Sequence, residues 1–116
     1  MKDIIIISHP IHIDDVRKIM ANHFQDMIKA VADIEKEIIA VGGSLHADEE
    51  KELLNNGSLQ RNLWGYNIYF DVEEPDRIEF DSMINLRPVQ GNRSRDIKDV
   101  IIREKIISIT SRLILF

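Results

Sequence analysis

The sequence predicts a single α+β domain in which helices pack on a mostly antiparallel sheet. Two apolar patterns alternate along the chain. Runs that are β-branched or apolar at every second residue are typical of strands, and runs with spacings of three and four are typical of amphipathic helices. The predicted order of elements is β-α-β-β-α-β-β-α, and 116 residues without repeats or a linker suit one domain with its own core.

The first strand is expected over Ile4–Ile7. This continuous β-branched run stops at Ser8-His9-Pro10, and we expect it to be buried on both faces of the sheet. A helix should follow, with Asp14 and Asp15 at its positive end. Its buried face is predicted from the spacing of Val16, Ile19, Met20, His23 and Phe24.

Residues 27–43 fit either one helix or a β-hairpin. Glu35-Lys36-Glu37 divides two apolar runs, and the alanines at positions 30, 32 and 40 favour a helix. The β-branched residues in both runs and the abrupt stop at Gly42-Gly43 favour two strands. We therefore predict a hairpin.

The next elements are predicted as a helix and a second hairpin. Acidic residues open a helix over Ala47–Asn55, and Gly57 follows its end. Leu63–Phe70 alternates and should form a strand, with one face made by Trp64, Tyr66, Ile68 and Phe70. After an acidic turn at Asp71–Asp76, a strand over Arg77–Asn85 should pair with it.

A loop from Leu86 to Lys98 separates this strand from a final helix. Asp99 suits the N-cap position, because its carboxylate can accept a hydrogen bond from the first turn. The helix is predicted from the regular spacing of Ile102, Ile106, Ile109 and Leu113.

Composition places the chain in the soluble globular class. Hydrophobic residues make up 44% of it and charged residues 30%, which favours a packed core over disorder. No apolar stretch approaches the about 20 residues of a membrane span, and the run after Met1–Asp3 is too short for a signal peptide. Cysteine is absent, which excludes disulfides and thiolate chemistry. We expect a cytoplasmic protein without a membrane partner.

Charge and motif content argue against several further classes. The net charge of −5 makes nucleic acid an unfavourable partner. The chain has no Walker loop, no dinucleotide-binding G-x-G-x-x-G and no G-x-S-x-G elbow. No cofactor is therefore predicted, and a serine hydrolase is disfavoured.

The segment Asn85–Arg95 is the strongest candidate for a binding site. It carries three arginines and no carboxylate in an acidic chain, and it precedes a helix, where anions are often held. Guanidinium groups can bind phosphate or carboxylate through two donors at once. The predicted ligand-binding residues are Arg87, Gln90, Asn92, Arg93, Ser94 and Arg95. The alternative is that the arginines form ion pairs with Glu73, Glu74, Glu79 or Asp81.

His46 is the best candidate for proton transfer, with Asp48, Glu49 or Asp81 assisting. A histidine and two carboxylates could also ligate a metal, but no H-E-x-x-H spacing is present and no metal site is predicted. Alternatively, these residues only open a helix and interact with its dipole.

Two weaker candidates remain. His9 and His12 precede Asp14 and Asp15 and could assemble a metal site, although a strand end followed by a helix start explains the same residues. In the strand predicted over 77–85, period two places two sets of side chains on opposite faces, Ile78, Phe80 and Ile84 on one and Glu79, Asp81 and Asn85 on the other. The polar set, with Asn67 opposite, could meet Arg87 in a cleft or form a solvated face.

Several short segments together resemble a family of short uncharacterised prokaryotic proteins. The segments are Val41–Gly43, Leu45–Glu50, Leu63–Tyr69, Ile78–Pro88 and Gly91–Ser94, and they read VGG, LHADEE, LWGYNIY, IEFDSMINLRP and GNRS. The resemblance covers nearly the whole chain. It implies a cytoplasmic protein and brings no activity, so it assigns no catalytic residue.

Two functions from different classes fit these observations. The first is a small protein that binds a phosphate- or carboxylate-bearing ligand at the Arg87–Arg95 loop, and its enzymatic version requires His46 to lie near Arg93. The second is a non-enzymatic homodimeric interaction module. Its motivation is the apolar end Leu113–Phe116, which must dock on its own sheet or on a partner.

Overall fold

The computed structural model describes residues 4–19 and 26–116. The first half of the chain forms β1 (Ile5–Ile7), β2 (Ile11–His12), α1 (Ile13–Ile19), β3 (Met27–Asp33), β4 (Ile38–Val41) and α2 (His46–Asn55). The second half forms the 3-10 turn η1 (Gln60–Asn62), β5 (Leu63–Tyr69), β6 (Ile78–Glu79), the 3-10 turns η2 (Met83–Asn85) and η3 (Pro88–Gln90), α3 (Val100–Leu113) and β7 (Ile114–Leu115).

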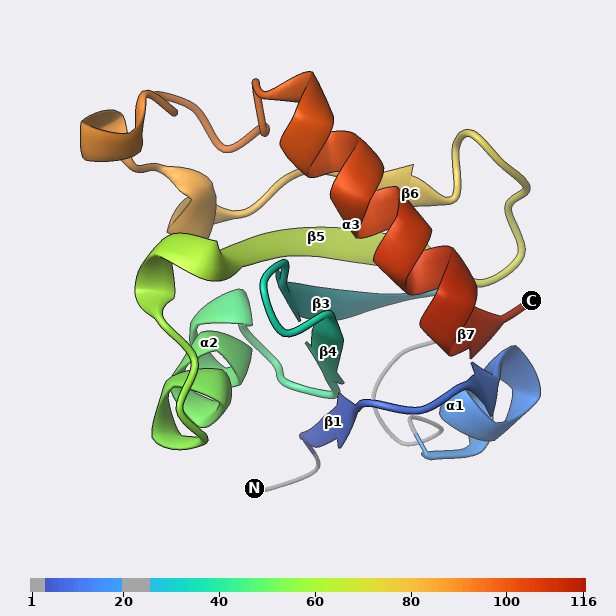
Figure 1. The fold of residues 1–116 in the computed structure, drawn as a ribbon. Helices are drawn as coiled ribbons and strands as arrows, with labels where there is room; N and C mark the ends of the chain where they lie inside the picture. The colour runs from blue at the N-terminus through green and yellow to red at the C-terminus, as the bar shows by residue number, and fades with distance from the viewer. Residues whose placement is uncertain (1–3, 20–25) are drawn as a thin grey trace.

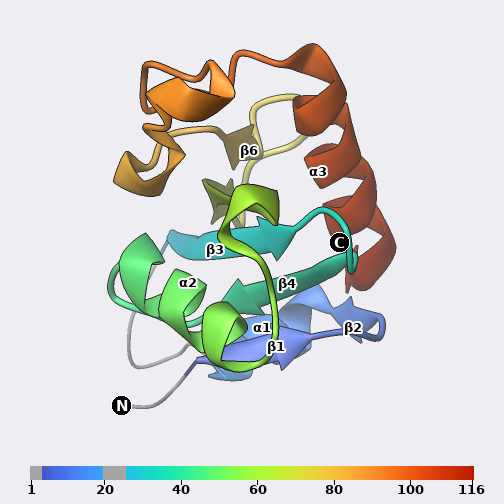
Figure 2. The ribbon, with the colours of Figure 1, turned by 60° about the vertical axis from the view of Figure 1, so that its left-hand side comes forward.

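The α+β class is confirmed. Five strands form one antiparallel sheet in the order β1-β4-β3-β5-β6, and the predicted order of elements is broadly matched. The sheet separates α2 from α3, which lie on its two sides (Figures 1 and 2). Because successive side chains of a strand point to opposite faces, each face carries its own apolar cluster.

The larger cluster lies on the α3 side of the sheet. It contains the aromatic face predicted for β5, together with Ile106, Ile109 and Leu113 of α3. The smaller cluster lies on the α2 side, where Leu53 packs against Val31, Ala40 and Leu63. α2 covers only part of its side of the sheet, and this uneven cover leaves room for the site described below.

The hairpin predicted over residues 27–43 is confirmed. Asp33 organises its turn, because Oδ1 accepts hydrogen bonds from the backbone N–H groups of Glu35 and Lys36, both at 2.9 Å. The alanines that favoured a helix have a packing reason: Ala30 pairs with Tyr66 and Ala32 with Trp64 across the strands. Small side chains on β3 leave room for the aromatic rings on β5.

The burial predicted for the first strand is wrong in part. β1 lies at the edge of the sheet, and only Ile7 is fully buried, whereas Ile5 and Ile6 are half-buried. The helix that follows begins at Ile13, and Val16 is buried as predicted. Ile19 is 44% exposed, so the prediction is wrong for this residue. Met20, His23 and Phe24, which were named for the same face, lie outside the described residues.

The strand predicted over residues 77–85 is wrong beyond its first residues. β6 covers only Ile78–Glu79, because the carboxamide of Asn85 takes the place of a strand partner for Gly65. Asn85 Oδ1 accepts a hydrogen bond from Gly65 N at 2.8 Å, and Nδ2 donates one to Gly65 O at 2.9 Å. A side chain thus satisfies backbone groups that a continued strand would have paired.

The segment around η2 consequently leaves the sheet. Ser82 lies directly over Gly65, where a Cβ atom would come within 2.6 Å of its hydroxyl oxygen. Ile84 packs with the smaller cluster, whereas Ile78 and Phe80 pack against the larger one. The predicted alternation therefore fails at Ile84 and Asn85.

The C-terminal residues form a two-stranded parallel sheet that the sequence pattern did not predict. β7 follows α3 directly and pairs with β2, with Ile11 beside Ile114. Ile114 is completely buried, and the guanidinium of Arg77 lies 3.8 Å from the centre of the Phe116 ring. The apolar end that motivated a dimer thus docks, at least in part, on its own chain.

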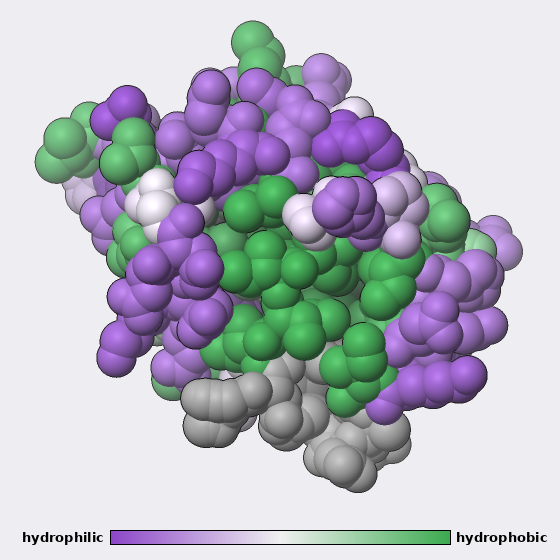
Figure 3. Space-filling model, turned by 60° about the horizontal axis from the view of Figure 1, so that its bottom comes forward, coloured by the Kyte–Doolittle hydropathy of each residue, from purple (hydrophilic) through white to green (hydrophobic). Residues whose placement is uncertain are grey.

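Apolar side chains also gather in the middle of one outer face, with polar side chains on both sides (Figure 3). Within the described residues, no helix combines the length and the apolar character needed to cross a bilayer.

Replacing Asn85 by Ala should strongly destabilise the fold. The change removes two hydrogen bonds to Gly65 and a third, at 3.0 Å, to the carbonyl of Arg95. Buried polar groups left without partners cost about 1–3 kcal/mol each, so we expect a loss of about 3 kcal/mol or more in the free energy of unfolding. Urea denaturation measures it. Asn55→Ala, on the exposed end of α2, is the control, and an equal small loss in both variants would contradict the role assigned to Asn85.

Candidate functional site

A row of three polar side chains crosses the sheet on the side of α2. Lys29 of β3 pairs with Asn67 of β5, and Asn67 pairs with Glu79 of β6. These residues alternate with the apolar side chains of the larger cluster, so they point away from it. The row lies beyond the part of the sheet that α2 covers, and it therefore faces a space instead of a packed helix.

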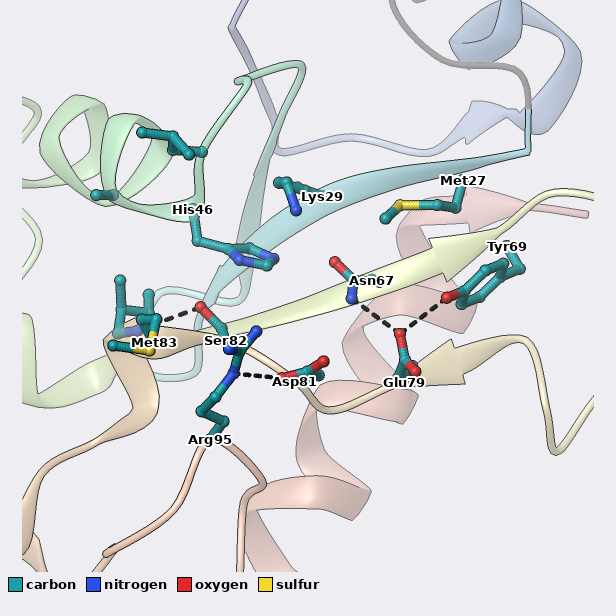
Figure 4. A pocket seen from close by; sticks show the side chains of 13 residues that line it. Met27, Lys29, His46, Asn67, Tyr69, Glu79, Asp81, Ser82, Met83 and Arg95 are labelled. Atoms are coloured by element: carbon teal, nitrogen blue, oxygen red, sulfur yellow. Dashed lines mark hydrogen bonds and ion pairs between the residues drawn. The ribbon is translucent and has the colours of Figure 1, made fainter.

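This space is a cavity of about 630 Å³. The row Lys29–Asn67–Glu79 forms its floor, together with Met27 and Tyr69. The start of α2 forms one wall, and the segment from Asp81 to Ile84 with Arg95 forms the opposite wall (Figure 4). Ligand pockets typically enclose about 300–1,000 Å³, so the cavity is large enough for a small organic molecule.

His46 is the first residue of α2, and its ring points into the cavity (Figure 4). Its Nε2 donates a hydrogen bond to the carbonyl oxygen of Tyr66 at 2.9 Å. Burial lowers the pKa of His46, and the Lys29 ammonium lowers it further, against the raising effects of Tyr66, Asn67 and Asp81. The ring is therefore neutral at pH 7, with the proton on Nε2 and a lone pair on Nδ1.

Glu79 organises the floor of the cavity. Its Oε1 accepts hydrogen bonds from Asn67 Nδ2 at 3.0 Å and from the Tyr69 hydroxyl at 2.9 Å. The hydrogen bond to Glu79 is also the main reason why the pKa of Tyr69 is raised. Because Asn67 turns its NH2 group to Glu79, its oxygen must face the opposite way, and this buried Oδ1 has no hydrogen-bond partner within the described part of the chain.

Two cations border the same space. Arg95 donates from Nε to Asp81 Oδ1 at 2.7 Å, and its remaining guanidinium N–H groups have no partner in residues 4–19 and 26–116. Lys29 likewise has no ion-pair partner among the residues that the structure describes. The cavity thus contains two cationic side chains, two carboxylates and one neutral imidazole.

Arg87 lies elsewhere and its guanidinium is engaged by the fold. It donates to the carbonyl oxygens of Ile84 at 3.0 Å and Gln60 at 2.8 Å, and it contacts Glu50 Oε2 at 3.4 Å. The group also lies over the Trp64 ring, 4.8 Å from its centre. Burial lowers the pKa of Arg87, against the effect of Glu50. Arg87 connects the loop to η1 and α2 and does not line the cavity.

The polar residues of the arginine loop mainly hold the loop itself. Asn92 Nδ2 donates to the carbonyl oxygens of Asn85, Ser94 and Asp96, and its Oδ1 accepts from Lys98 N. The Gln90 side chain donates to Arg61 O at 3.2 Å, and Ser94 Oγ is buried without a partner within the described residues. Arg93 is exposed and lines no part of the cavity. Of the six predicted ligand-binding residues, only Arg95 does so.

The predicted proton-transfer residues divide in the same way. His46 and Asp81 both line the cavity, whereas Asp48 is exposed on α2 and lies outside it. Glu49 is fully buried one helical turn after His46, and its Oε2 accepts from Gly43 N at 2.9 Å. Burial raises the pKa of Glu49 well above its usual range, against the effect of the hydrogen bond from Gly43 N.

His9 and His12 lie at and just before β2, outside the cavity. His12 Nδ1 accepts a hydrogen bond from Asp14 N at 3.1 Å, and His9 contacts Ser8. Within residues 4–19 and 26–116, no group of three or more histidine, aspartate or glutamate side chains is arranged to hold a metal ion.

Sequence reasoning paired Asn67 with the polar face of Glu79 and Asp81, and the register places Asn67 opposite Glu79. It missed Lys29, Tyr69 and Ser82. Lys29 had a usable signal, because it is the one charged residue between Met27 and Ala32 and so marks the polar face of β3. Ser82 had none, since its position depends on the turn that Asn85 imposes.

The pH dependence of stability should report the neutral state of His46. In the unfolded chain the imidazole titrates near 6.5 and in the fold it titrates lower, so the unfolded state binds more protons between the two values. The stabilising contribution is complete above pH 6.5 and is lost as the pH falls through the folded pKa. Urea unfolding from pH 5 to 7 should therefore show a steeper rise of stability for the wild type than for His46→Gln. Equal slopes would contradict a lowered pKa.

Glu49 should have the opposite effect. Its carboxyl ionises near 4.5 in the unfolded chain and at higher pH in the fold, so the folded state binds more protons between these values and stability falls as the pH rises. Glu49→Gln keeps an oxygen acceptor for Gly43 N without the charge. We expect its stability relative to wild type to increase between pH 5 and 8, as measured by thermal unfolding. A difference that stays constant over this range would show that Glu49 ionises normally.

Comparison with known proteins gives a family but no function. A family model described as "Protein of unknown function (DUF5674)" matches residues 5–113. No curated protein and no solved structure matches the chain. The match spans all described elements except the final strand, and the resemblance to an uncharacterised family is thereby confirmed. The chain belongs to the DUF5674 family of proteins of unknown function.

Proposed function

We propose that this protein binds a small organic molecule that carries a carboxylate or phosphate group, and that the ligand occupies the cavity over Lys29, Asn67 and Glu79. The observation that carries the proposal is the convergence of Lys29 and Arg95 on one space of about 630 Å³. Both side chains keep N–H groups without partners among the described residues, and such groups favour an anion.

The position of the anion follows from the neighbouring ion pair. Asp81 holds Arg95 through Nε, which orients the guanidinium plane and leaves its Nη atoms for a ligand. Lys29 reaches the same space from the floor, so an oxyanion between the two would contact donors from β3 and from the loop before α3 (Figure 4). Arg95 is in this way the contribution of the arginine loop to the site.

The apolar part of the lining supports an organic ligand over a simple ion. Leu45, Met83 and Ile84 border the cavity beside α2 and η2, and Leu45 and Met83 are 59% and 63% exposed. Exposed side chains of this size beside a polar floor are typical of pockets that bind a carbon skeleton through contact and orient it through a few polar groups.

A second candidate function is acid–base catalysis on the bound molecule. The specific observation in its favour is His46, whose Nε2 is held by the Tyr66 carbonyl so that Nδ1 presents a lone pair to the cavity. A neutral imidazole fixed in one tautomer can accept a proton from a ligand. His46→Gln should then lower turnover far more than it weakens ligand binding.

Binding is tested with ¹⁵N-labelled protein and a panel of carboxylates and phosphate monoesters at millimolar concentration. We expect chemical-shift changes at the backbone amides of Lys29, Asn67, Ser82 and Arg95. Arg95→Gln should weaken binding about tenfold or more, since a hydrogen bond to a charged group contributes about 1.5–3 kcal/mol.

Arg93→Gln is the matched control, because Arg93 is in the same loop but outside the cavity. If Arg93→Gln abolished binding and Arg95→Gln did not, the cavity would not be the binding site, and the outer surface of the loop would be favoured instead. The absence of shifts with every member of the panel would overturn the proposed function.

A further inference from the structure

We infer that the ligand of this cavity is a zwitterion of the amino-acid type, with an ammonium group, a carboxylate and an apolar side chain. The inference rests on the proposed function and narrows its ligand class. It starts from hydrogen-bond acceptors in the cavity that the fold leaves without donors.

The first of these acceptors is Asn67 Oδ1. The side chain is 5% exposed, and its orientation is set by the donation from Nδ2 to Glu79. Exchanging the oxygen and the nitrogen would bring two acceptors together at Glu79, so this arrangement is the favourable one. The oxygen is left on the cavity side without a donor among the described residues, which is costly for a buried carbonyl group.

Two further acceptors border the same space. His46 uses Nε2 for Tyr66 O, which leaves Nδ1. Glu79 uses Oε1 for Asn67 and Tyr69, which leaves Oε2. In Figure 4 the Asn67 carboxamide lies between the His46 ring and the Glu79 carboxylate, with its oxygen on the side away from Glu79. An ammonium group carries three N–H donors and a positive charge. It can donate to Asn67 Oδ1 and His46 Nδ1, and the Glu79 carboxylate adds its negative charge from the other side of the carboxamide.

The negatively charged group of the ligand requires hydrogen-bond donors. Lys29 and Arg95 have N–H groups without partners among the described residues, and these groups suit a carboxylate. The formal charges of Lys29 and Arg95 balance those of Glu79 and Asp81, and His46 adds none. A cavity with both signs and no net charge favours a ligand that also has both signs and no net charge. A phosphate monoester would bring an uncompensated double charge into a protein of net charge −5.

The apolar group of the ligand is assigned to the side of the cavity formed by Leu45, Met83 and Ile84. The hydrogen-bond acceptors, the two cationic side chains and the apolar side chains line one cavity, so a single small molecule can contact all of them. The volume of about 630 Å³ accommodates a free amino acid with a large side chain and also a dipeptide.

The test is calorimetric titration of the full chain with L-leucine and leucyl-leucine, beside two blocked analogues. N-acetyl-leucine lacks the ammonium charge, and leucinamide lacks the carboxylate. We expect at least one zwitterion to bind about tenfold or more tightly than either blocked form, because each block removes charge-assisted hydrogen bonds.

The outcomes separate this inference from the proposed function. Equal affinity for leucine and N-acetyl-leucine would overturn the zwitterion and leave an anion site. Binding of leucinamide as tight as that of leucine would overturn both. Binding of phosphate monoesters or simple carboxylates without any zwitterion would overturn only the inference. No binding by any of these molecules would overturn both.

A variant pair provides the residue-level test. Glu79→Gln retains an oxygen for Asn67 and Tyr69 but removes the charge, so it should weaken the zwitterion about tenfold and leave N-acetyl-leucine unchanged. Glu73→Gln, in the exposed acidic turn outside the cavity, should change neither. Thermal unfolding confirms that both variants fold. Equal weakening of both ligands in Glu79→Gln would contradict an ammonium contact.

Discussion

The hydrogen bonds between Asn85 and Gly65 determine the shape of this protein on the side where the cavity lies. The Asn85 side chain satisfies the backbone groups of Gly65 at the edge of β5. The backbone after β6 therefore does not need to continue as a strand, and it leaves the sheet and forms η2. The same Asn85 amide donates to the carbonyl of Arg95, and Ser82 N donates to that carbonyl at 3.1 Å. The turn at Ser82 and the start of the segment before α3 are therefore fastened at one point. Arg95 comes to lie beside Asp81 because of this junction.

The elements that could be predicted are those in which local periodicity and tertiary packing agree. The alternation in β5 and the helical spacing in α3 both match the larger cluster, and Asp99 caps α3 through a 2.9 Å hydrogen bond from Ile101 N, as its side chain predicts. The strand predicted after β6 was wrong because Asn85 continues the alternation of polar residues in the sequence. Its side chain, however, hydrogen-bonds to the backbone of Gly65, 20 residues earlier. A sequence pattern cannot distinguish an asparagine that faces solvent on a strand from one whose side chain takes the place of a strand partner. The two differ only in the distant residue to which the side chain hydrogen-bonds.

The candidate site was partly accessible to the same reasoning. His46, Asp81 and Arg95 were named for their chemistry, and Asn67 and Glu79 for their face. Lys29 was not named, because its meaning depends on the register between β3 and β5. The polar side chains of the arginine loop mainly hold the loop itself. Most of its polar groups bond to backbone carbonyls within the fold, and Asn92 alone holds three of them. A loop of 13 residues (86–98) with little regular structure must satisfy its own backbone before it can serve a ligand.

The contact between Arg87 and Trp64 gives the molecule an optical property. Trp64 is the only tryptophan of the chain, it is 2% exposed, and a cationic group lies over its ring. Indole emission depends on solvent and on nearby charge, so the fluorescence of this one residue depends on whether the loop beyond η2 is seated. That loop begins next to the cavity wall formed by Asp81–Ile84, and its residue Arg95 is part of the same wall. A change in emission without loss of secondary structure would thus mark the opening of that wall, separately from unfolding of the sheet.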